Sequence, residues 1–316
     1  MPMTQQWDPG TAGATSLASL PEAARARMAE IQRSHTWGSA LTTQEFAAIK
    51  GAGFDPVGQV LGSAVYHIGY TGGWSCAGAW PYYGGTNTAY GGRIYNPAVA
   101  TTQVSSSAWA PFSALVKTMY GARRLALGRA MAECSALGGD GIVGVKLRIG
   151  RFPQGGLEFT ALGTAVRAPG NKRPRQPFTS HVTGQEFAKL IHSGWVPSGL
   201  AIGISISSRH DDYRTRMARS WSAGNQEITG YTELINHTRH DARNQLMKDA
   251  QSHGGDGVVV DEMDMRIGER ECPSYEGQKD HIAEVVFLGT SIVRFDRSAR
   301  AGVPKPLTIM KLNRES

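Results

Sequence analysis

The side chains best suited to chemistry in this chain are two histidines and an aspartate within one short run. His237, His240 and Asp241 lie in the segment INHTRHDAR, and residues three and four apart share one face of a helix. Two imidazoles and a carboxylate are workable ligands for a divalent transition metal. The simpler alternative is a solvated polar helix face, on which histidine often has no ligand role. The run is therefore a candidate metal site, to be weighed against that alternative.

Catalytic motifs are missing from the sequence. It contains no nucleophile elbow, no Walker loop, no His-Glu-x-x-His and no dinucleotide-binding fingerprint in a strand-to-helix setting. The three cysteines, Cys76, Cys134 and Cys272, have neither metal-ligand nor disulfide spacing. We therefore expect a protein that is not an enzyme, with buried or free thiols.

Two helix-to-strand junctions organise the chain. The stretches ALGGDGIVGVKLRI (136–149) and SHGGDGVVVDEMDMRI (252–267) share the order Gly-Gly-Asp-Gly, followed by a β-rich run. A glycine just past a helix can take the left-handed conformation that ends it, and Asp-Gly is a tight-turn dipeptide. Each junction therefore predicts a helix, a glycine stop and a strand.

The junctions belong to a longer duplication. TTQEFAAIKGAGFDPVGQVLGSAVY begins at Thr42, and TGQEFAKLIHSGWVPSGLAIGISIS begins at Thr183, with identical spacing. Each starts with a Thr-x-x-Glu capping box that opens a short helix. Further along, Met131 matches Met247 on the long helices. The predicted fold class is α+β, with two tandem βαββ units, each preceded by a short helix.

Each unit is too small to be self-sufficient, because three strands and a helix bury little apolar surface. Each should pack against its sister, against another subunit, or against both, so we expect a homo-oligomer. The expected segments are an N-terminal segment with an exposed helix (1–38), a first repeat (39–168), a Pro-rich basic linker (169–180), a second repeat (181–296) and a basic tail (297–316).

The first repeat carries an insertion that the second lacks. Its aromatic residues alternate with glycine and include Trp74, Trp80, Tyr82 and Tyr83. Rings supply contact area and glycines supply adaptability, which suits a surface for a protein partner. A loop that packs its own rings explains the composition equally well.

The overall charge and hydropathy limit the partners. The net charge is +7 and the isoelectric point is near 9.4, but the basic residues are scattered apart from the linker and the tail. This distribution disfavours a nucleic-acid-binding protein. The amino terminus has no signal-peptide pattern, and no apolar run approaches about 18 residues. We therefore expect a cytoplasmic protein without a membrane span.

The long helix ending in ALGGDGIVGV (136–145) and the later ALGTAVR (161–167) resemble the bacterial YbjQ-like family, which is associated with heavy-metal binding. SHGGDGVVV and FLGTSIV in the second copy are looser matches. The two copies together span roughly residues 42 to 295. The resemblance implies a dodecin-like βαββ subunit that assembles into a ring, with a pentamer favoured.

Family members often carry acids at alternate positions of the strand after the helix. Lys146 and Arg148 stand there in the first copy, and Glu262 and Asp264 stand there in the second. A metal held through this strand would therefore bind only in the second copy. The opposite charges could instead meet as complementary pairs between units, or both faces could simply be solvated.

Asp261 precedes these acids and matches Val145. Its position in the alternation would turn a carboxylate toward an apolar face, where it would need a partner. A bulge in the strand or a place at an oligomer seam would leave it exposed to water.

These features favour a ring-forming scaffold or binding protein, which we expect to bind a partner or ligand. The alternative is a metal-ion sensor or storage protein that uses the second-repeat histidine and carboxylate residues given above. A divalent transition metal is the one cofactor that the residues bring into consideration.

Overall fold

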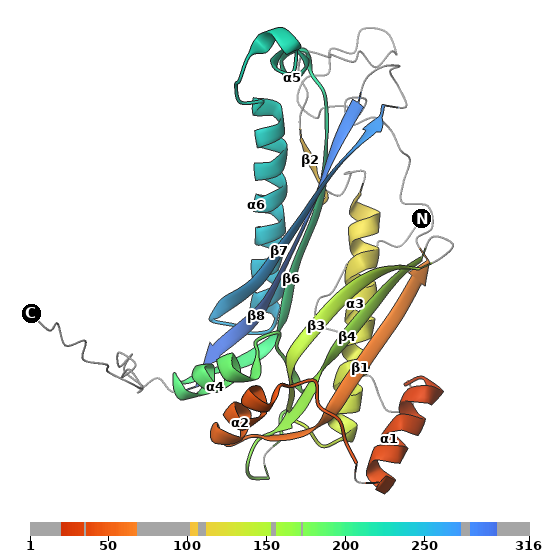
Figure 1. The fold of residues 1–316 in the computed structure, drawn as a ribbon, viewed down its shortest axis with the longest axis vertical. Helices are drawn as coiled ribbons and strands as arrows, with labels where there is room; N and C mark the ends of the chain where they lie inside the picture. Colours follow the sequence, from red (N-terminus) through yellow and green to blue (C-terminus); the bar gives the residue numbers. More distant parts are fainter. Residues whose placement is uncertain are drawn as a thin grey trace, which may run out of the picture.

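The computed structural model describes residues 20–34, 36–67, 102–106, 112–152, 156–171, 173–272 and 279–295. The described part is a mixed α+β fold with two β-sheets, in agreement with the expected class (Figure 1). The four aromatic residues singled out in the insertion, Trp74, Trp80, Tyr82 and Tyr83, lie outside these ranges, as does the basic tail.

The elements of the first half precede residue 168. They are α1 (Glu22–Ser34), α2 (Thr43–Gly51), β1 (Asp55–His67), β2 (Gln103–Val104), α3 (Ser113–Ala136), β3 (Gly141–Phe152) and β4 (Gly156–Arg167).

The second half follows the same plan, with a short helix, a strand, a long helix and a hairpin. Its elements are β5 (Phe178–Thr179), α4 (Gly184–His192), β6 (Trp195–His210), α5 (Tyr213–Ala218), the 3-10 helix η3 (Trp221–Ala223), α6 (Thr229–Ser252), β7 (Gly257–Glu271) and β8 (Lys279–Arg294).

The three long strands of each sheet have the same order, and the short fourth strand lies on opposite edges of the two sheets. The first sheet runs β1-β4-β3-β5 and the second runs β2-β6-β8-β7. All pairs are antiparallel except β3 with β5. The last strand of each half therefore lies in the middle, with the strand before it at one side. The expected linker is not wholly irregular, because its last residues form β5 on the edge of β3.

Local sequence signals account for the helix ends. The capping boxes of Thr42 with Glu45 and of Thr183 with Glu186 are both formed. Gly138 and Gly254 follow the long helices with φ of 69° and 70°, the left-handed conformation that glycine tolerates best. The predicted glycine stops are confirmed.

Each long helix packs closely on the first strand of its own half through a glycine. A Cβ atom built on Gly62 would lie 1.9 Å from the carbonyl oxygen of Ala126 in α3. A Cβ atom on Gly203 would lie 1.9 Å from the carbonyl oxygen of Ala242 in α6. Any side chain at these two positions would push the helix off its sheet.

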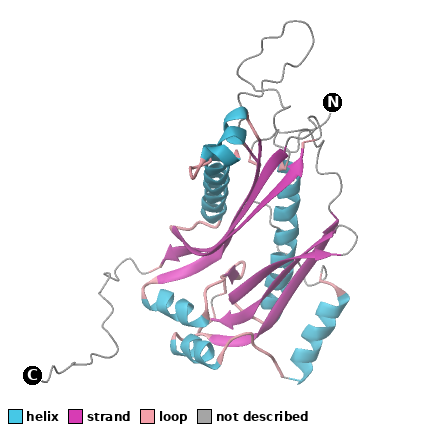
Figure 2. Ribbon diagram, turned by 45° about the horizontal axis from the view of Figure 1, so that its top comes forward, coloured by secondary structure: helices cyan, strands magenta, loops and turns pink. Residues whose placement is uncertain are grey.

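The central helix α3 joins the two halves. One core cluster contains Val116 and Met119 of α3, Phe159 of β4, and Ile202 and Ile204 of β6. The other side of the second sheet is covered by α6, where Leu246 packs on Ala201. Figures 1 and 2 both show α3 and α6 on either side of that sheet. Within the described ranges, no helix is both long and apolar enough to span a bilayer.

Candidate functional site

The contact between the two halves is built around the segment that leads into α4. Residues 178–182 run along the outer edge of β3 with backbone hydrogen bonds throughout. They are Phe178 N–H to Asp140 O (3.1 Å), Ser180 N–H to Ile142 O (2.9 Å), Val145 N–H to Ser180 O (2.8 Å) and Gly144 N–H to Val182 O (3.1 Å). The second half thus adds a strand-like segment to the sheet of the first half.

Apolar side chains seal this contact, which we call the inner junction. Phe187 of α4 is fully buried in a cluster with Val182, Ile49 of α2 and Val143 of β3. The Phe178 ring stacks on Phe187, with centroids 5.8 Å apart and planes inclined by 16°. The helices α2 and α4 lie side by side at this end of the molecule (Figure 1).

The same segment is also tied to its own half. The hydroxyls of Ser180 and Thr290 share a hydrogen bond of 3.2 Å, and the N–H of His181 donates to Thr290 at 3.0 Å. A single short segment therefore bridges β8 of the second half and β3 of the first.

The first half presents a counterpart of this segment at residues 37–46. The hydroxyls of Ser39 and Thr164 share a hydrogen bond of 3.4 Å, and the N–H of Ala40 donates to Thr164 at 3.0 Å. Trp37 stacks on Phe46 with centroids 6.1 Å apart and planes inclined by 16°. These contacts reproduce those of the second half almost in detail.

The two segments differ in what covers them. Phe187 is fully buried at the inner junction, whereas Phe46 is partly exposed and Trp37 is 39% exposed. In the described part of the chain, the backbone of residues 37–46 pairs with no strand edge. The outer edge of β3 is occupied by β5 of the other segment. The first half therefore displays a docking segment without a sheet edge to dock on.

The second half displays the complementary surface, the outer edge of β7. In the described ranges β7 pairs with β8 alone, and Val260 on it is 50% exposed. A pocket of about 250 Å³ lies beside this edge. Its lining residues are Val182, Glu186, Lys189, Leu190, Ser193 and Val259. An exposed strand edge beside an apolar pocket is a template for pairing with another chain.

The charged strand residues predicted to meet at an interface are exposed. Lys146 and Arg148 lie on β3, and Glu262 and Asp264 lie on β7. Within the described residues Asp264 forms an ion pair with Arg266 at 3.1 Å. The structure does not bring the two charged pairs together within one chain.

Asp261 is exposed at a β-bulge between Val260 and Glu262. The extra residue of a bulge leaves the regular alternation of the strand. The carboxylate therefore does not face the apolar side that simple alternation predicts, and the bulge is the reason.

The predicted helix ligands do not converge. His237 and His240 are exposed on α6. Asp241 is buried against the sheet, where it accepts a hydrogen bond of 2.7 Å from the hydroxyl of Ser205. Asp241 thus has a structural partner, and the two histidines face solvent.

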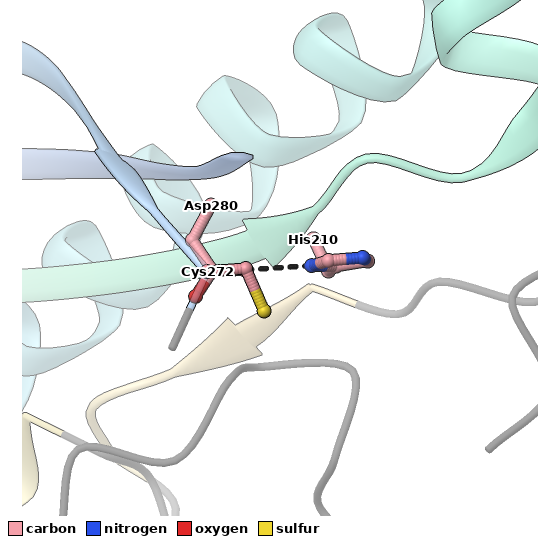
Figure 3. Close-up of side chains that lie close together, drawn as sticks. All are labelled: His210, Cys272 and Asp280. Atoms are coloured by element: carbon pink, nitrogen blue, oxygen red, sulfur yellow. Dashed lines mark hydrogen bonds and ion pairs between the residues drawn. The ribbon is translucent and has the colours of Figure 1, made fainter. Parts of the chain in front are cut away.

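A different group of metal-ligand side chains comes together at the far end of the second sheet. His210, Cys272 and Asp280 each offer one donor atom, and these atoms all lie within 4.8 Å of one another. All three are buried, and His210 Nδ1 lies 2.8 Å from Asp280 Oδ1. Figure 3 shows the three side chains close together at the ends of β6, β7 and β8.

The surroundings of this group are strongly polar. Arg270 lies 3.2 Å from the second carboxylate oxygen of Asp280. Nearby, Arg219 donates to Asp211 at 2.8 Å. Burial by itself would raise the pKa of Asp211, but the hydrogen bond and charge of His281 and the charge of Arg219 lower it. This end of the sheet therefore holds charges and metal-type donors away from water.

Sequence spacing could not reveal the buried group, because its members come from three strand ends. His210 lies opposite Asp280 in the register of β6 and β8, and Cys272 follows the end of β7. The docking segment could have been found from the sequence. Trp37 and Phe178 lie five residues before Thr42 and Thr183, so they extend the duplicated motif toward the amino terminus.

The fold defines a class of α+β proteins in which two β-sheets are joined through the helix α3. Comparison with known proteins identifies the family. The family described as "Putative heavy-metal-binding", YbjQ, matches residues 98–169. The encapsulin nanocompartment protein Rv1762c of Mycobacterium tuberculosis is 32% identical over 249 residues, which cover 76% of this chain and 82% of the relative.

A second relative is the UPF0145 protein PBPRB0184 of Photobacterium profundum. It is 33% identical over 81 residues, which cover 26% of this chain and 71% of the relative. No solved structure matches the chain. The chain belongs to the YbjQ-like family, as its glycine junctions and its Gly-Thr strand indicated.

Proposed function

We propose that this protein is a self-assembling, non-enzymatic scaffold whose copies join head to tail. Each copy would place its segment 37–46 on the β7 edge of the next copy, as the segment 178–187 lies on β3 within one chain. The observation that carries the proposal is that one chain contains this junction once in finished form. In the described residues, the segment 37–46 and the β7 edge, which would form a second such junction, are left without a partner.

The finished junction predicts the backbone contacts of the proposed one. Matching positions give four hydrogen bonds between copies: Trp37 N–H to Asp256 O, Ser39 N–H to Val258 O, Val260 N–H to Leu41 O and Asp261 N–H to Ser39 O. Both edges carry a bulge at the same place, between Val143 and Lys146 on β3 and between Val260 and Glu262 on β7. The two edges therefore present their donors in the same register.

The pocket beside β7 suits the apolar side chains of the arriving segment. Leu41 and Phe46 correspond to Val182 and Phe187, which fill the inner junction. Thr43 stands where Gly184 does, and Gly184 has no space for a Cβ atom against Glu45. The arriving helix must therefore stand farther from α4 than α4 stands from α2, and the pocket provides that room.

The symmetry of the assembly follows from the two surfaces that meet at each contact. Two different patches meet at each contact, so the association is heterologous and generates a ring if it closes or a filament if it does not. We favour a closed ring of five chains, in which two units of each chain are copies of one ancestral unit. Support also comes from the relative in Mycobacterium tuberculosis, which is named as an encapsulin nanocompartment protein.

Cysteine crosslinking tests this arrangement directly. Ile142 and Thr179 are register partners at the inner junction, and Val258 and Gly38 are the matching residues at the proposed one. A chain with Gly38→Cys and Val258→Cys should give a ladder of covalent oligomers on mild oxidation or with a short thiol crosslinker. The control with Ile142→Cys and Thr179→Cys should crosslink within one chain only.

Three results would contradict the proposal. The unsubstituted chain could stay monomeric at all accessible concentrations in native mass spectrometry. Gly38→Cys with Val258→Cys could give no intermolecular bond in assembled protein. Finally, Val260→Lys, which places a charge on the exposed strand edge, could leave assembly unchanged, although such a charge opposes edge pairing.

We propose metal binding as a second function, favoured by the convergence of His210, Cys272 and Asp280. Zinc binds thiolate sulfur and imidazole nitrogen at about 2.0–2.3 Å, so donors within 4.8 Å of one another need only a small movement to share an ion. Thiolate with imidazole and carboxylate suits a transition metal better than calcium or magnesium. Arg270 would have to release Asp280 in part.

Metal content per chain separates the two candidate sites. Protein loaded with Zn²⁺ and desalted should hold one equivalent, which Cys272→Ser should remove and Cys134→Ser should leave. If His237→Ala with His240→Ala removes the metal instead, the site is the exposed helix face together with Glu262 and Asp264. If the unsubstituted protein holds no metal after loading with Zn²⁺ and desalting, metal binding is refuted and the scaffold proposal is unaffected.

A further inference from the structure

Each half contains an acidic residue that ties its long helix to the strand on which that helix packs, and in the first half this residue is fully buried. Glu133 of α3 accepts a hydrogen bond from the N–H of Leu61 at 2.8 Å. Asp249 of α6 accepts one from the N–H of Ile202 at 2.9 Å. Glu133 and Asp249 each lie two residues after the matching methionines of the long helices. The two acids therefore occupy matching places beside β1 and β6.

In the second half, the acid is paired with an arginine from the preceding unit. Arg123 of α3 donates to Asp249 at 2.9 Å and to the carbonyl oxygen of Leu200 at 2.8 Å. Its side chain is 7% exposed. The helix α3 of the first half is thus held against β6 by a charge pair whose arginine is buried.

In the first half, helix α1 supplies the arginine. Arg27 of α1 pairs with Glu133 through the same guanidinium nitrogen that Arg123 uses on Asp249. Figure 1 shows α1 near β1 at the lower end of α3, which it contacts. At Glu133, the helix α1 therefore supplies an arginine as α3 does at Asp249.

The second long helix retains the arginine that a neighbouring copy would need. Arg123 lies eight residues before Met131, and Arg239 lies eight residues before Met247. Arg239 is only partly exposed, and its Nε has no hydrogen-bond partner among the described residues. If copies join as the inner junction joins the two halves, Arg239 of one copy arrives at Glu133 of the next.

Two helices cannot fill the same place beside β1. Glu133 is 0% exposed, so its carboxylate has room for one guanidinium at a time. Aside from its contact with Glu133, the helix α1 is held only weakly, since Met28 is its one buried residue. Its remaining side chains are exposed or half-exposed.

We infer that α1 is a built-in competitor of assembly, in which Arg27 occupies the Glu133 site that Arg239 of a second copy takes in the assembled state. The helix α1 swings away from β1 when copies join, and its departure sets the concentration at which they do so. This inference rests on the proposed head-to-tail function.

The test measures the midpoint concentration of assembly by sedimentation velocity on full-length variants. Arg27→Ala should lower the midpoint several-fold, because the competitor is weakened. Arg239→Ala should raise it several-fold. The matched controls are Arg25→Ala, an exposed residue of α1, and Arg243→Ala, an exposed residue of α6, and both should leave the midpoint unchanged.

Hydrogen exchange on the unsubstituted chain gives a second measurement that does not depend on how the variants fold. Peptides of α1 should lose protection when the protein assembles. Equal protection of α1 in monomer and assembly, or an unchanged midpoint for Arg27→Ala, would overturn the competitor role.

The outcomes keep the two proposals distinct. If Gly38→Cys with Val258→Cys crosslinks between chains but Arg27→Ala behaves as Arg25→Ala does, head-to-tail assembly stands and the competitor role of α1 is wrong. If no variant crosslinks between chains, the head-to-tail arrangement itself is wrong, whatever α1 does.

Discussion

The carboxylate of Glu133 accepts a hydrogen bond of 2.8 Å from the backbone N–H of Leu61, although the two residues lie on different elements of the first half. Leu61 is on β1, and Glu133 is near the end of α3. Burial raises the pKa of Glu133, while the Leu61 N–H and the Arg27 guanidinium act in the opposite direction. The hydrogen bond from Leu61 thus stabilises the charged form of Glu133 inside the protein.

Replacing Glu133 with alanine should destabilise the protein by about 1–3 kcal/mol, because the Leu61 N–H and Arg27 lose their partner in a buried place. Urea denaturation followed by circular dichroism measures this change. Glu30→Ala is the control, since Glu30 is exposed on α1 and such surface changes stay within about 0.5 kcal/mol. Equal stability of the two variants would contradict the role assigned to Glu133.

Gly203→Ala should destabilise the second half by about 1–3 kcal/mol or more, since the added methyl group would overlap the carbonyl oxygen of Ala242. Gly268→Ala on β7 provides the comparison, because its Cβ would meet nothing within 4 Å. Thermal unfolding of both variants measures the difference. A Gly203→Ala protein as stable as the Gly268→Ala protein would show that α6 does not pack as described.

Stability should fall on the acid side partly through His181. Burial lowers its pKa from the ordinary 6.5, against the opposing charges of Asp261 and Glu186. Because the folded imidazole is neutral where the unfolded one is protonated, its contribution is present above about pH 6.5 and is lost as pH falls through the lowered folded pKa.

The measurement is the free energy of unfolding at about pH 8 and about pH 5 for the unsubstituted chain and for His181→Ala. Alanine is the residue at the matching position 40. The variant should be less stable at the higher pH, because the hydrogen bond of His181 to Thr290 is lost, and the two stabilities should converge at the lower pH. A constant difference between them would exclude His181 as a source of the pH dependence.

Cys134 should resist alkylation in the native protein. It is fully buried, and burial raises the pKa of its thiol to about 12, so almost no thiolate is present at about pH 8. Peptide mass mapping after treatment with iodoacetamide should find Cys134 modified in denaturant and unmodified without it. Native modification at a rate typical of an exposed thiol would mean that α3 leaves its sheet readily.

Much of the fold could be predicted from the sequence, because its signals are local. The Thr-x-x-Glu boxes of Thr42 and Thr183 and the helix-ending glycines Gly138 and Gly254 act within a few residues of themselves. The α+β class and the order of elements in each half follow from them.

The candidate sites depended on contacts that no local signal contains. Strand register placed His210 opposite Asp280, while a single bulge removed Asp261 from the face that alternation predicts. The helix face proposed for metal lost Asp241 to Ser205, because the rotation of α6 on its sheet is fixed by the close approach at Gly203.

The sequence by itself determined the α+β class and the glycine-ended helices, and it predicted two similar units, each covered by something outside itself. Only the tertiary structure decided which distant segments meet: the segment 178–187 on β3, the arginine of α3 on Asp249, and Arg27 of α1 on Glu133. The physical reason is that helix and turn signals are carried by neighbouring residues, whereas a buried charge pair or a shared strand edge exists only where distant segments meet.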